Sequence, residues 1–406
     1  MNYNEALEYI HSLLRFGSRP GLERIRELLS ALGNPQDQLK FLHIAGTNGK
    51  GSVCTMLSRC LIEAGYKTGL YISPYITCFR ERIQINGEYI SESDLASLTE
   101  KVKNTGIEVT EFEFITAVAF LYFKAKGCDV VVLETGLGGR LDATNVIKPP
   151  LAAVITGIGF DHTAVLGEML SEIAGEKCGI IKEDCRVFTT YNQPPEAASV
   201  INSHKNVVAP DLLKLSGIKS DLSGNTFIYK GIEYNVSLIG RHQIENALLV
   251  IETLRGCSLS VSDEDIRKGL SNTSFPARLE ILSREPLVIL DGAHNPHGAR
   301  ALSNEMRKFQ GITLITGMMA DKDCEEVVSI IAPLCEKIVT VTVEDNPRSI
   351  TAVDLAEIAK KYCPSVTAAE SYSHALDLCE NDKTIFVSGS LYLAGGIREL
   401  IKERLS

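Results

Sequence analysis

The chain has 406 residues, of which 45% are hydrophobic and 23% are charged. This balance is typical of a globular protein, and the length predicts two domains. The formal net charge of −10 argues against nucleic acid as a partner. No apolar tract is long enough to cross a bilayer. The segment Met1 to Arg15 carries Glu5, Glu8 and His11 among apolar residues. It therefore predicts an amphipathic helix and not a secretory signal.

The 11 cysteines show no CxxC spacing. This pattern is typical of a reduced cytoplasmic protein. As a separate expectation, the chain is a monomer. Cys54, Cys60, Cys128 and Cys178 lie among apolar or small residues, so we interpret them as part of the core and not as nucleophiles.

In chain order, apolar runs alternate with helical patterns through the first part of the sequence. Such a rhythm predicts parallel strands flanked by helices. The predicted strands are Phe41–Ala45, Thr68–Ile72, Val130–Leu133 and Ala152–Ile155, and the predicted helices include Val53–Ala64 and Phe112–Lys126. Between Ser216 and Leu238 the pattern changes, because Asp221–Asn225 and Lys230-Gly231 have the composition of hairpin turns.

After a helix predicted over Ile239–Leu254, a second alternating series begins near Leu287. Its predicted strands are Leu287–Leu290, Ile312–Thr316, Lys337–Val343, Ser365–Ala368 and Thr384–Val387, and its last helix is Leu391–Leu405. We therefore predict an α/β protein with a P-loop-type, mostly parallel sheet domain that carries a small antiparallel insert. A smaller Rossmann-like α/β domain follows it. The apolar periodicity breaks between Ser271 and Arg284, which predicts domains over residues 1–276 and 277–406.

The first predicted strand is followed by the glycine-rich loop Gly46-Thr47-Asn48-Gly49-Lys50-Gly51-Ser52. Glycines let backbone N–H groups approach phosphate oxygens, and the N-terminus of the next helix favours negative charge. Lys50 can reach terminal phosphates, and Ser52 can bind Mg²⁺ or a phosphate oxygen. The usual P-loop pattern has glycine where this chain has Ile44, and Gly51 separates Lys50 from Ser52. An ordinary glycine-rich turn is therefore the alternative.

Polar residues also follow the other predicted strands. Ser73, Glu134 and the pair Asp161-His162 each come after an apolar run. Ligands of open parallel sheets bind outside the carboxyl ends of the strands, so we expect these residues and the glycine loop to share one crevice. A hydroxyl and a carboxylate suit Mg²⁺, whereas an imidazole is an unusual ligand for so hard a cation. The alternative for His162 is a solvated loop histidine.

Three further motifs are weaker when taken alone. The run from Glu134 to Asn145 has three closely spaced glycines with Arg140 and Asp142, which permits close approach to a ligand but also fits a flexible surface turn. Lys177 lies on a predicted helix, where its spacing alone indicates a solvated side chain. The run Asp291–Pro296 follows a strand and could close a nucleotide site between domains or form a plain capped turn.

Together these motifs resemble the folylpolyglutamate synthase and dihydrofolate synthase branch of the Mur ligase family. The resemblance extends from the Gly17–Arg24 segment to Ser388–Tyr392. Its most specific pieces are His43–Ser52, Glu81–Gly87, Glu134–Asn145, Asp161-His162, Glu176–Ile180 and Asp291–Pro296.

The resemblance implies an ATP-dependent ligase that adds L-glutamate to a folate, or to dihydropteroate, through an acyl phosphate. It implies ATP contacts at Asn48, Gly49, Lys50, Gly51, Ser52, Asn246, Arg278, Asp291 and His294. It implies Mg²⁺ at two sites held by Ser73, Glu134, His162 and Lys177, with Lys177 carbamylated. Lys50, Lys177 and His162 would be catalytic. Thr110, Phe112, Asp142 and Ala143 match positions near the pterin.

Three positions depart from the family's common residues: Tyr75 replaces a histidine, Gly157 an asparagine and Ala277 a glycine. One alternative function keeps the ligase chemistry but uses another carboxylate, such as a peptidoglycan precursor. A P-loop NTPase without ligase activity, or a non-catalytic nucleotide-binding protein, is a further alternative. Neither would account for Lys177 and the second domain.

Overall fold

The computed structural model describes residues 1–17, 21–344 and 346–405, so Ser18, Arg19 and Pro20 of the N-terminal motif lie outside the described residues. The chain divides into two compact units. The first comprises Met1–Lys219, Thr226–Ser237 and Gln243–Thr273, and the second comprises Ser220–Asn225, Leu238–His242 and Ser274–Ser406. The last change between units thus falls after Thr273, whereas the predicted domain boundary follows residue 276. Among the described residues, no helix is both long and apolar enough to span a membrane.

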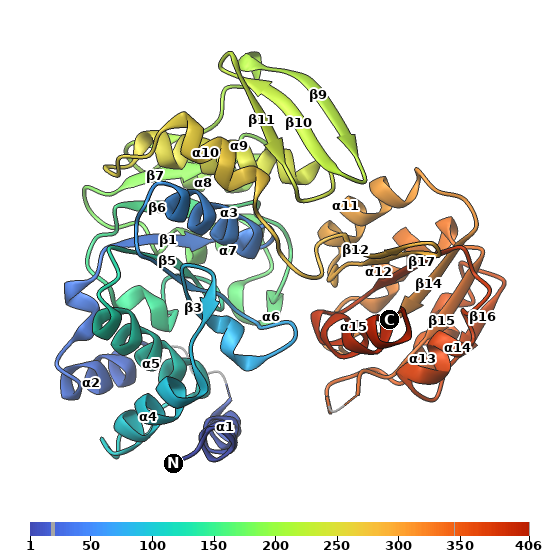
Figure 1. Cartoon of the computed structure of the whole chain (residues 1–406), viewed down its shortest axis with the longest axis horizontal. Helices are drawn as coiled ribbons and strands as arrows, with labels where there is room; N and C mark the ends of the chain where they lie inside the picture. Colours follow the sequence, from blue (N-terminus) through green and yellow to red (C-terminus); the bar gives the residue numbers. More distant parts are fainter. Residues whose placement is uncertain (18–20, 345, 406) are drawn as a thin grey trace. The chain divides into compact units, whose positions relative to one another are not determined.

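Within its described part, the first unit contains an eight-stranded sheet of order β4-β3-β2-β5-β1-β6-β7-β8 (Figure 1). Its strands are β1 Phe41–Ala45, β2 Thr68–Tyr71, β3 Ile83–Ile85, β4 Glu88–Tyr89, β5 Val130–Glu134, β6 Ala152–Ile155, β7 Arg186–Thr189 and β8 Val207–Val208. The six strands β2, β5, β1, β6, β7 and β8, in their order across the sheet, pair in parallel. The strands β3 and β4 add an antiparallel edge beside β2. Ile44 of the central strand β1 pairs with Glu134 of β5 and Val154 of β6, so these strands end side by side.

The α-helices of the first unit are α1 Tyr3–Ser12, α2 Glu23–Ala31, α3 Lys50–Glu63, α4 Glu92–Lys103, α5 Glu111–Lys126, α6 Thr163–Leu166, α7 Leu170–Cys178, α8 Pro195–Asn202, α9 His242–Gly256 and α10 Asp263–Ser271. Short 3₁₀ helices are η1 Leu13–Phe16, η2 Pro35–Gln38, η3 Phe79–Arg82, η4 Ala143–Val146 and η5 Leu212–Lys214. The predicted helix from Ile239 is wrong at its start, because Gly240 has a φ of +101° that no helix accommodates.

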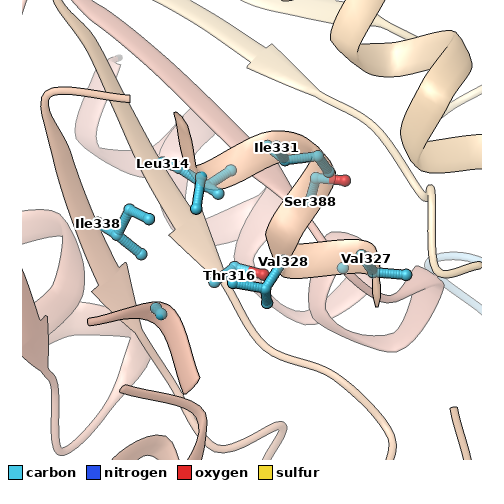
Figure 2. Close-up of a pocket in the computed structure, with 10 residues that line it drawn as sticks. Leu314, Thr316, Val327, Val328, Ile331, Ile338 and Ser388 are labelled. Atoms are coloured by element: carbon cyan, nitrogen blue, oxygen red, sulfur yellow. The ribbon is translucent and has the colours of Figure 1, made fainter. Parts of the chain in front are cut away.

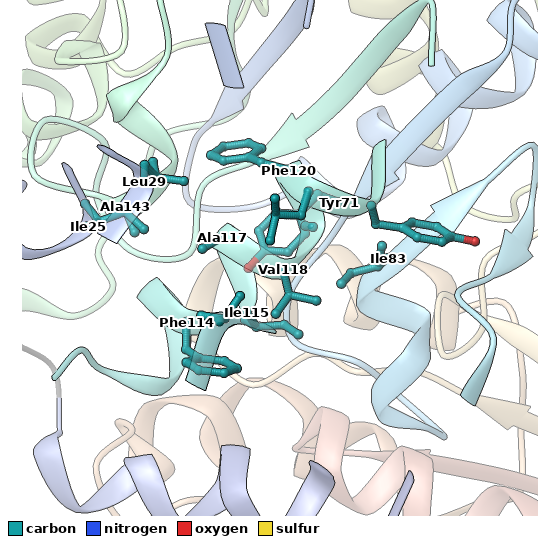
Figure 3. Packing of buried hydrophobic residues seen from close by; sticks show 14 of the residues in the cluster. Ile25, Leu29, Tyr71, Ile83, Phe114, Ile115, Ala117, Val118, Phe120 and Ala143 are labelled. Carbon is teal, nitrogen blue, oxygen red and sulfur yellow. The ribbon is translucent and has the colours of Figure 1, made fainter. Parts of the chain in front are cut away.

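One hydrophobic core of the first unit lies between α5 and the sheet. Figure 3 shows Phe114, Val118 and Phe120 of α5 near Tyr71 of β2, and Leu29 of α2 belongs to the same core. Burial of each such side chain stabilises the fold by about 1.5–3 kcal/mol. The α5 helix is therefore anchored over most of its length, and its N-terminus holds two of the predicted pterin-binding residues.

The predicted insert is a three-stranded sheet of β9 Leu215–Asp221, β10 Gly224–Tyr229 and β11 Ile232–Val236, in the order β11-β10-β9 within the described chain. Its strands are joined by tight turns, which only antiparallel neighbours permit. This confirms the hairpins predicted from Asp221–Asn225 and Lys230-Gly231.

The described part of the second unit has a six-stranded sheet of order β12-β13-β17-β14-β15-β16. Its strands are β12 Glu280–Arg284, β13 Leu287–Leu290, β14 Ile312–Thr316, β15 Lys337–Thr340, β16 Val366–Ala368 and β17 Thr384–Ser388. Its helices are α11 Pro296–Met306, α12 Cys324–Ile331, η6 Ala332–Leu334, α13 Ala352–Ala359, α14 Tyr372–Asp377 and α15 Leu391–Leu405. Only β12 pairs antiparallel to its neighbour, so the predicted Rossmann-like α/β domain is confirmed for the strands that the structure describes.

A small cavity of about 10 Å³ lies inside the second unit, between the sheet and α12 (Figure 2). Its lining is mostly apolar, with Leu314, Val328 and Ile338 among the residues that face it. A space of this size holds at most about one water molecule, so it is a packing defect of the core and not a ligand site.

All 11 cysteines lie in the described residues and are free thiols. Cys54, Cys60 and Cys178 are buried, which confirms their predicted place in the core. Cys128 is only partly buried, but it packs against the hydrophobic core of the first unit, as predicted.

Candidate active site

The glycine loop after β1 requires glycine at two of its positions. Gly46 and Gly49 both have positive φ, at +154° and +88°. A side chain at Gly46 would collide with Thr156, and a Cβ at Gly49 would lie 2.6 Å from Oδ1 of Asn246. Because α3 begins at Lys50, the backbone N–H groups of its first turn are those that a helix N-terminus offers to a phosphate.

Hydrogen bonds tie the loop to the segment after β6. Thr47 N and Asn48 N donate to the carbonyl of Gly157 at 2.9 and 3.2 Å. The Thr47 hydroxyl donates to the carbonyl of Gly159 at 3.0 Å. A Cβ at Gly157 would meet only Asn48 O, at 4.0 Å, so space does not require glycine at this position. The backbone at Gly157 supports the loop whichever residue stands there.

Two lysines converge on one carbonyl of the loop. Lys50 Nζ donates to Gly46 O at 3.2 Å, and Lys177 Nζ donates to the same oxygen at 2.8 Å. Lys177 is only 5% exposed, so the solvated side chain indicated by its spacing is wrong. Burial, followed by the charge of Lys50, lowers the pKa of Lys177 to about 7, while Asp161 and Asp142 oppose this effect. Lys177 therefore has a substantial neutral fraction near neutral pH.

This lowered pKa predicts how stability depends on pH. The ordinary lysine pKa of 10.5 applies to the unfolded chain, so between about 7 and 10.5 the unfolded state binds more protons at Lys177. Stability from this group therefore rises with pH through that window, and the cost of burying the cation is complete below it. In CO₂-free buffer, Lys177→Met is expected to be more stable than the unchanged protein at low pH, by a margin that shrinks as pH rises. Urea unfolding across this range measures it, and a pH-independent difference would contradict the lowered pKa.

Glu134 ends β5 and is buried, and its Oε2 accepts a hydrogen bond from Ser73 N at 3.1 Å. The structure thus brings together two of the four predicted metal ligands. A carboxylate and a hydroxyl are hard oxygen donors, which suits Mg²⁺. Among the described residues, no group of three or more His, Cys, Asp or Glu side chains is arranged to hold a metal ion. The predicted set contains only two residues of these types, Glu134 and His162.

His162 lies at the N-terminus of α6 in a left-handed conformation, with a φ of +51°. Its backbone N donates to Oδ1 of Asp161 at 2.9 Å, and its ring Nε2 lies 3.8 Å from the same oxygen. The side chain is exposed. A non-glycine residue in this conformation is uncommon, and such strain is concentrated at functional sites.

The glycine-rich loop after β5 is held by Asp142. The Asp142 carboxylate is buried and accepts hydrogen bonds from Gly136 N and Leu137 N, both at 2.9 Å, and from Thr144 N at 3.0 Å. Burial raises the pKa of Asp142, while these hydrogen bonds and one from the Thr144 hydroxyl oppose the shift. Arg140 and Leu141 are exposed, but residues 142–145 are buried and the Asp142 carboxylate holds the loop by hydrogen bonds, which argues against the flexible surface turn considered as an alternative.

The other predicted pterin residues lie around this loop or at the start of α5. A Cβ at Gly136 would lie 2.6 Å from the ring of Phe112, so ring and loop are in close contact. Ala143 is buried beside Asp142. Thr110 caps α5, and its hydroxyl donates to Glu113 at 2.9 Å. Phe112, Asp142 and Ala143 therefore come together, while Thr110 has a structural partner of its own.

Two residues near the site were not singled out from the sequence. Gln243 is fully buried, accepts a hydrogen bond from Asn246 Nδ2 at 2.9 Å, and donates to the Ser52 hydroxyl at 3.4 Å. It thereby links Asn246 to the phosphate loop. His43 of β1 is fully buried, with Nε2 2.8 Å from the Thr144 hydroxyl. The sequence did offer a signal for His43, because a polar histidine inside an apolar strand needs a hydrogen-bond partner.

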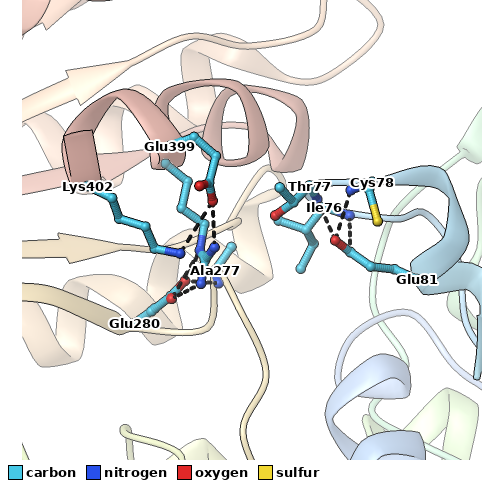
Figure 4. A network of polar contacts seen from close by, with 9 residues as sticks. Ile76, Thr77, Cys78, Glu81, Ala277, Glu280, Glu399 and Lys402 are labelled. Atoms are coloured by element: carbon cyan, nitrogen blue, oxygen red, sulfur yellow. Dashed lines mark hydrogen bonds and ion pairs between the residues drawn. The ribbon is translucent and has the colours of Figure 1, made fainter. Parts of the chain in front are cut away.

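Tyr75, the first departure from the family pattern, belongs to an aromatic cluster. Its ring meets that of Phe79 edge-on, with centroids 5.5 Å apart, and the Arg82 guanidinium lies 5.3 Å from the Tyr75 centroid. The loop that follows Tyr75 is ordered by Glu81, whose carboxylate accepts hydrogen bonds from three successive backbone N–H groups, at residues 76–78 (Figure 4).

In the second unit, two of the three predicted nucleotide residues, Asp291 and His294, follow β13, whereas Arg278 precedes β12. Asp291 is buried and accepts hydrogen bonds from Leu279 N at 3.0 Å and Ala293 N at 2.8 Å. Burial raises its pKa, while the charge of Arg278 opposes the shift. His294 Nδ1 lies 2.8 Å from the Gly292 carbonyl. The backbone around Asp291 is thus fixed by its own carboxylate, and Pro296 opens α11 as predicted.

Two non-glycine residues beside Arg278 have left-handed backbones: Ala277 has a φ of +54° and Leu279 of +49°. Glu280 secures this turn, because it accepts a hydrogen bond from Ala277 N at 3.0 Å and pairs with Arg398 at 2.6 Å (Figure 4). Ala277, which replaces the glycine common in the family, therefore has a backbone conformation that favours glycine.

Ala277→Gly is expected to stabilise the protein by about 0.5–1 kcal/mol. Relief of the left-handed strain, worth about 1–2 kcal/mol, is partly offset by the greater freedom of glycine in the unfolded chain. The midpoint of urea unfolding measures the change. Ala299→Gly in α11 is the matched control and is expected to destabilise by about 1 kcal/mol. A loss of stability in Ala277→Gly would contradict the strain.

A glycine loop at a strand-to-helix turn, a buried lysine on α7 and a buried carboxylate at the end of β5 are the features expected of a nucleotide-using α/β enzyme. The family model "Mur ligase middle domain" matches residues 44–254, and "Mur ligase, glutamate ligase domain" matches residues 277–391. The dihydrofolate synthase/folylpolyglutamate synthase of Bacillus subtilis is 36% identical and covers 98% of this chain and 99% of its own length. The chain therefore belongs to the Mur ligase family, in its folylpolyglutamate synthase and dihydrofolate synthase branch.

Solved structures agree with this relationship. The folylpolyglutamate synthase of Mycobacterium tuberculosis, complexed with ADP and AMPPCP, superposes with a TM-score of 0.87 at 30% identity, over 98% of this chain and 99% of that one. Escherichia coli FolC, in complex with DHPP and ADP, has a TM-score of 0.87 at 29% identity, over 100% of this chain and 99% of that one. The predicted fold class is confirmed.

Proposed function

We propose that this chain is an ATP-dependent ligase that adds L-glutamate to a folate through an acyl phosphate, and that it also makes dihydrofolate from dihydropteroate. The observation that carries the proposal is the pair of lysines on Gly46 O, one at the phosphate loop and one buried on α7. A P-loop NTPase has no use for the second lysine. The names of the relatives support the substrates, because both activities appear among them.

The reaction follows from the chemistry of carboxylates. A carboxylate is a poor acyl donor, so the γ-phosphoryl of ATP is transferred to it, giving an acyl phosphate and ADP. The amine of glutamate then attacks the acyl carbon, phosphate leaves, and the nitrogen loses a proton to complete the amide. Lys50 offsets charge on the transferred phosphoryl group from its place at the start of α3. Asn48 and the backbone N–H groups of Gly49, Gly51 and Ser52 are proposed to hold the phosphates.

Lys177 is proposed to be carbamylated. Its neutral amine attacks CO₂, and loss of a proton leaves a carbamate with one negative charge. The lowered pKa supports this step, because only the unprotonated nitrogen is nucleophilic. The carbamate also replaces repulsion between Lys177 and Lys50 by attraction. A buried cation thereby becomes an oxygen ligand.

Ser73, Glu134, His162 and the carbamate would hold Mg²⁺ at two sites. When bound, Mg²⁺ neutralises charge on the phosphate oxygens. Asn246 and, from the second unit, Arg278, Asp291 and His294 are proposed to contact the nucleotide, and Thr110, Phe112, Asp142 and Ala143 the pterin. Free thiols throughout the cysteine set support the proposed cytoplasmic location, and the proposal includes a monomer.

The test supplies the purified protein with ATP, Mg²⁺, labelled glutamate and either dihydropteroate or tetrahydrofolate. Label is expected in an amide product that forms with at least one pterin, together with one ADP for each bond. A peptidoglycan precursor in place of the pterin serves as the competing substrate. Phosphate release that ignores both glutamate and pterin would overturn the proposal, and label only in the precursor would favour another Mur-type ligase.

A further inference from the structure

His43 is a buried polar residue that the proposed mechanism does not use. It is the central residue of β1, between β5 and β6, and has no exposed surface. An imidazole in such a place costs free energy unless it is hydrogen-bonded. Its Nε2 meets the Thr144 hydroxyl at 2.8 Å, whereas its Nδ1 has no hydrogen-bond partner within the described part of the chain.

The direction of each proton in this contact can be derived. The Thr144 hydroxyl lies 2.5 Å from Oδ1 of Asp142, which also accepts a hydrogen bond from Thr144 N. Oδ2 accepts from Gly136 N and Leu137 N, so both carboxylate oxygens are already used as acceptors. A carboxylate only accepts, and the hydroxyl proton of Thr144 must therefore point to Asp142. Thr144 then has only a lone pair for His43, and His43 must carry its proton on Nε2.

We propose that His43 is a positioning residue for the pterin-bearing substrate, which acts through a directed relay from His43 Nε2–H to the Thr144 hydroxyl and on to the Asp142 carboxylate. The relay joins β1, which leads into the phosphate loop, to the turn of the glycine-rich loop after β5. It fixes the orientation of Asp142 by a hydrogen bond across 101 residues of sequence. This inference rests on the proposed function, because it takes Asp142 to face the pterin.

The surroundings keep the relay in one protonation state. Burial, and next the charge of Lys182, lower the pKa of His43 to about 3, so the ring is neutral at physiological pH. Lys182 is itself held in place, since its Nζ donates to Asn145 O at 3.0 Å and to Ile147 O at 2.5 Å. The imidazole therefore acts as a fixed hydrogen-bond donor and not as an acid or base.

Three variants test the relay. His43→Leu removes the donor, Thr144→Val removes the hydroxyl at nearly constant shape, and His43→Gln keeps an N–H donor near the position of Nε2. In His43→Leu the KM for the pterin substrate is expected to rise about tenfold, the worth of one buried hydrogen bond, with kcat and the KM for ATP within about twofold. His43→Gln is expected to recover most of the loss.

The double variant His43→Leu/Thr144→Val distinguishes a relay from two separate packing effects. If the relay exists, the pterin KM of the double variant is no higher than that of Thr144→Val. The His43 hydrogen bond can act on Asp142 only through the Thr144 hydroxyl, which both variants lack. Effects that multiply, or equal losses for ATP and pterin, would overturn the proposal. If His43→Leu does not fold, Thr144→Val alone is expected to show the selective rise in the KM for the pterin substrate. An unchanged pterin KM in Thr144→Val would also overturn the proposal.

A measurement independent of activity separates this inference from the proposed function. Long-range ¹H–¹⁵N correlation spectra of the unchanged protein are expected to show His43 as the Nε2–H tautomer, without titration between about pH 5 and 8. The Nδ1–H tautomer would overturn the relay. If no pterin gives an amide product while the spectra show the expected tautomer, the proposed function fails and the hydrogen-bond chain stands.

Discussion

Lys177→Ala is expected to lower the rate of glutamate ligation about a thousandfold, in line with the loss of a group that stabilises charge in the transition state. The variant removes both the hydrogen bond to Gly46 O and the nitrogen on which the carbamate forms. Added acetate or another short carboxylic acid is expected to restore part of the rate, since it can supply the missing carboxylate-like oxygens. Labelled glutamate in the amide product, measured with and without the acid, gives both results.

Lys182→Ala is the matched control for this experiment. Lys182 is a partly buried lysine, and burial lowers its pKa to about 8. Its Nζ donates to the carbonyls of Asn145 and Ile147 and not to the glycine loop. The control is expected to lose stability, and short acids are not expected to rescue it. Full activity in Lys177→Ala without any added acid would refute the carbamate.

Glu134→Gln is expected to lower ligation by about 10²–10³-fold and to raise the Mg²⁺ concentration needed for half of the maximal rate. The amide oxygen can still accept the hydrogen bond from Ser73 N, so the strand end keeps its geometry. What the variant loses is one negative charge in a buried place, which is the feature that a hard cation requires. Initial rates over a Mg²⁺ titration at saturating ATP measure both effects.

Glu252→Gln controls for loss of a buried carboxylate elsewhere. Glu252 lies on α9 and pairs with Lys230 at 2.6 Å. Its replacement is expected to reduce stability while leaving the Mg²⁺ dependence unchanged. If Glu134→Gln shows the Mg²⁺ dependence of the unchanged protein, Glu134 is not a metal ligand. The proposed role of Ser73 as a metal ligand would then lose the support of its neighbour.

Much of the fold could be predicted because its signals are local. The strand Phe41–Ala45 was correct to the residue, since an uninterrupted apolar run fits a strand buried on both faces. The glycine loop that follows was also predictable, because two of its residues need positive φ. One failed prediction has a local cause, because the positive φ of Gly240 delays the start of α9 to His242. The strand predicted over Lys337–Val343 also ends early, at Thr340.

The sequence by itself thus determined the two α/β units, the phosphate loop and the polar strand ends, all of which follow from periodicity and residue type. Only the tertiary structure decided the state of Lys177, whose spacing on a helix indicates a solvated cation but whose burial depends on distant elements packed against it. The same holds for His43 and Asp142, which Thr144 joins across the fold. Burial and hydrogen bonding between segments far apart in sequence change a side chain's charge and direction, and no local pattern records them.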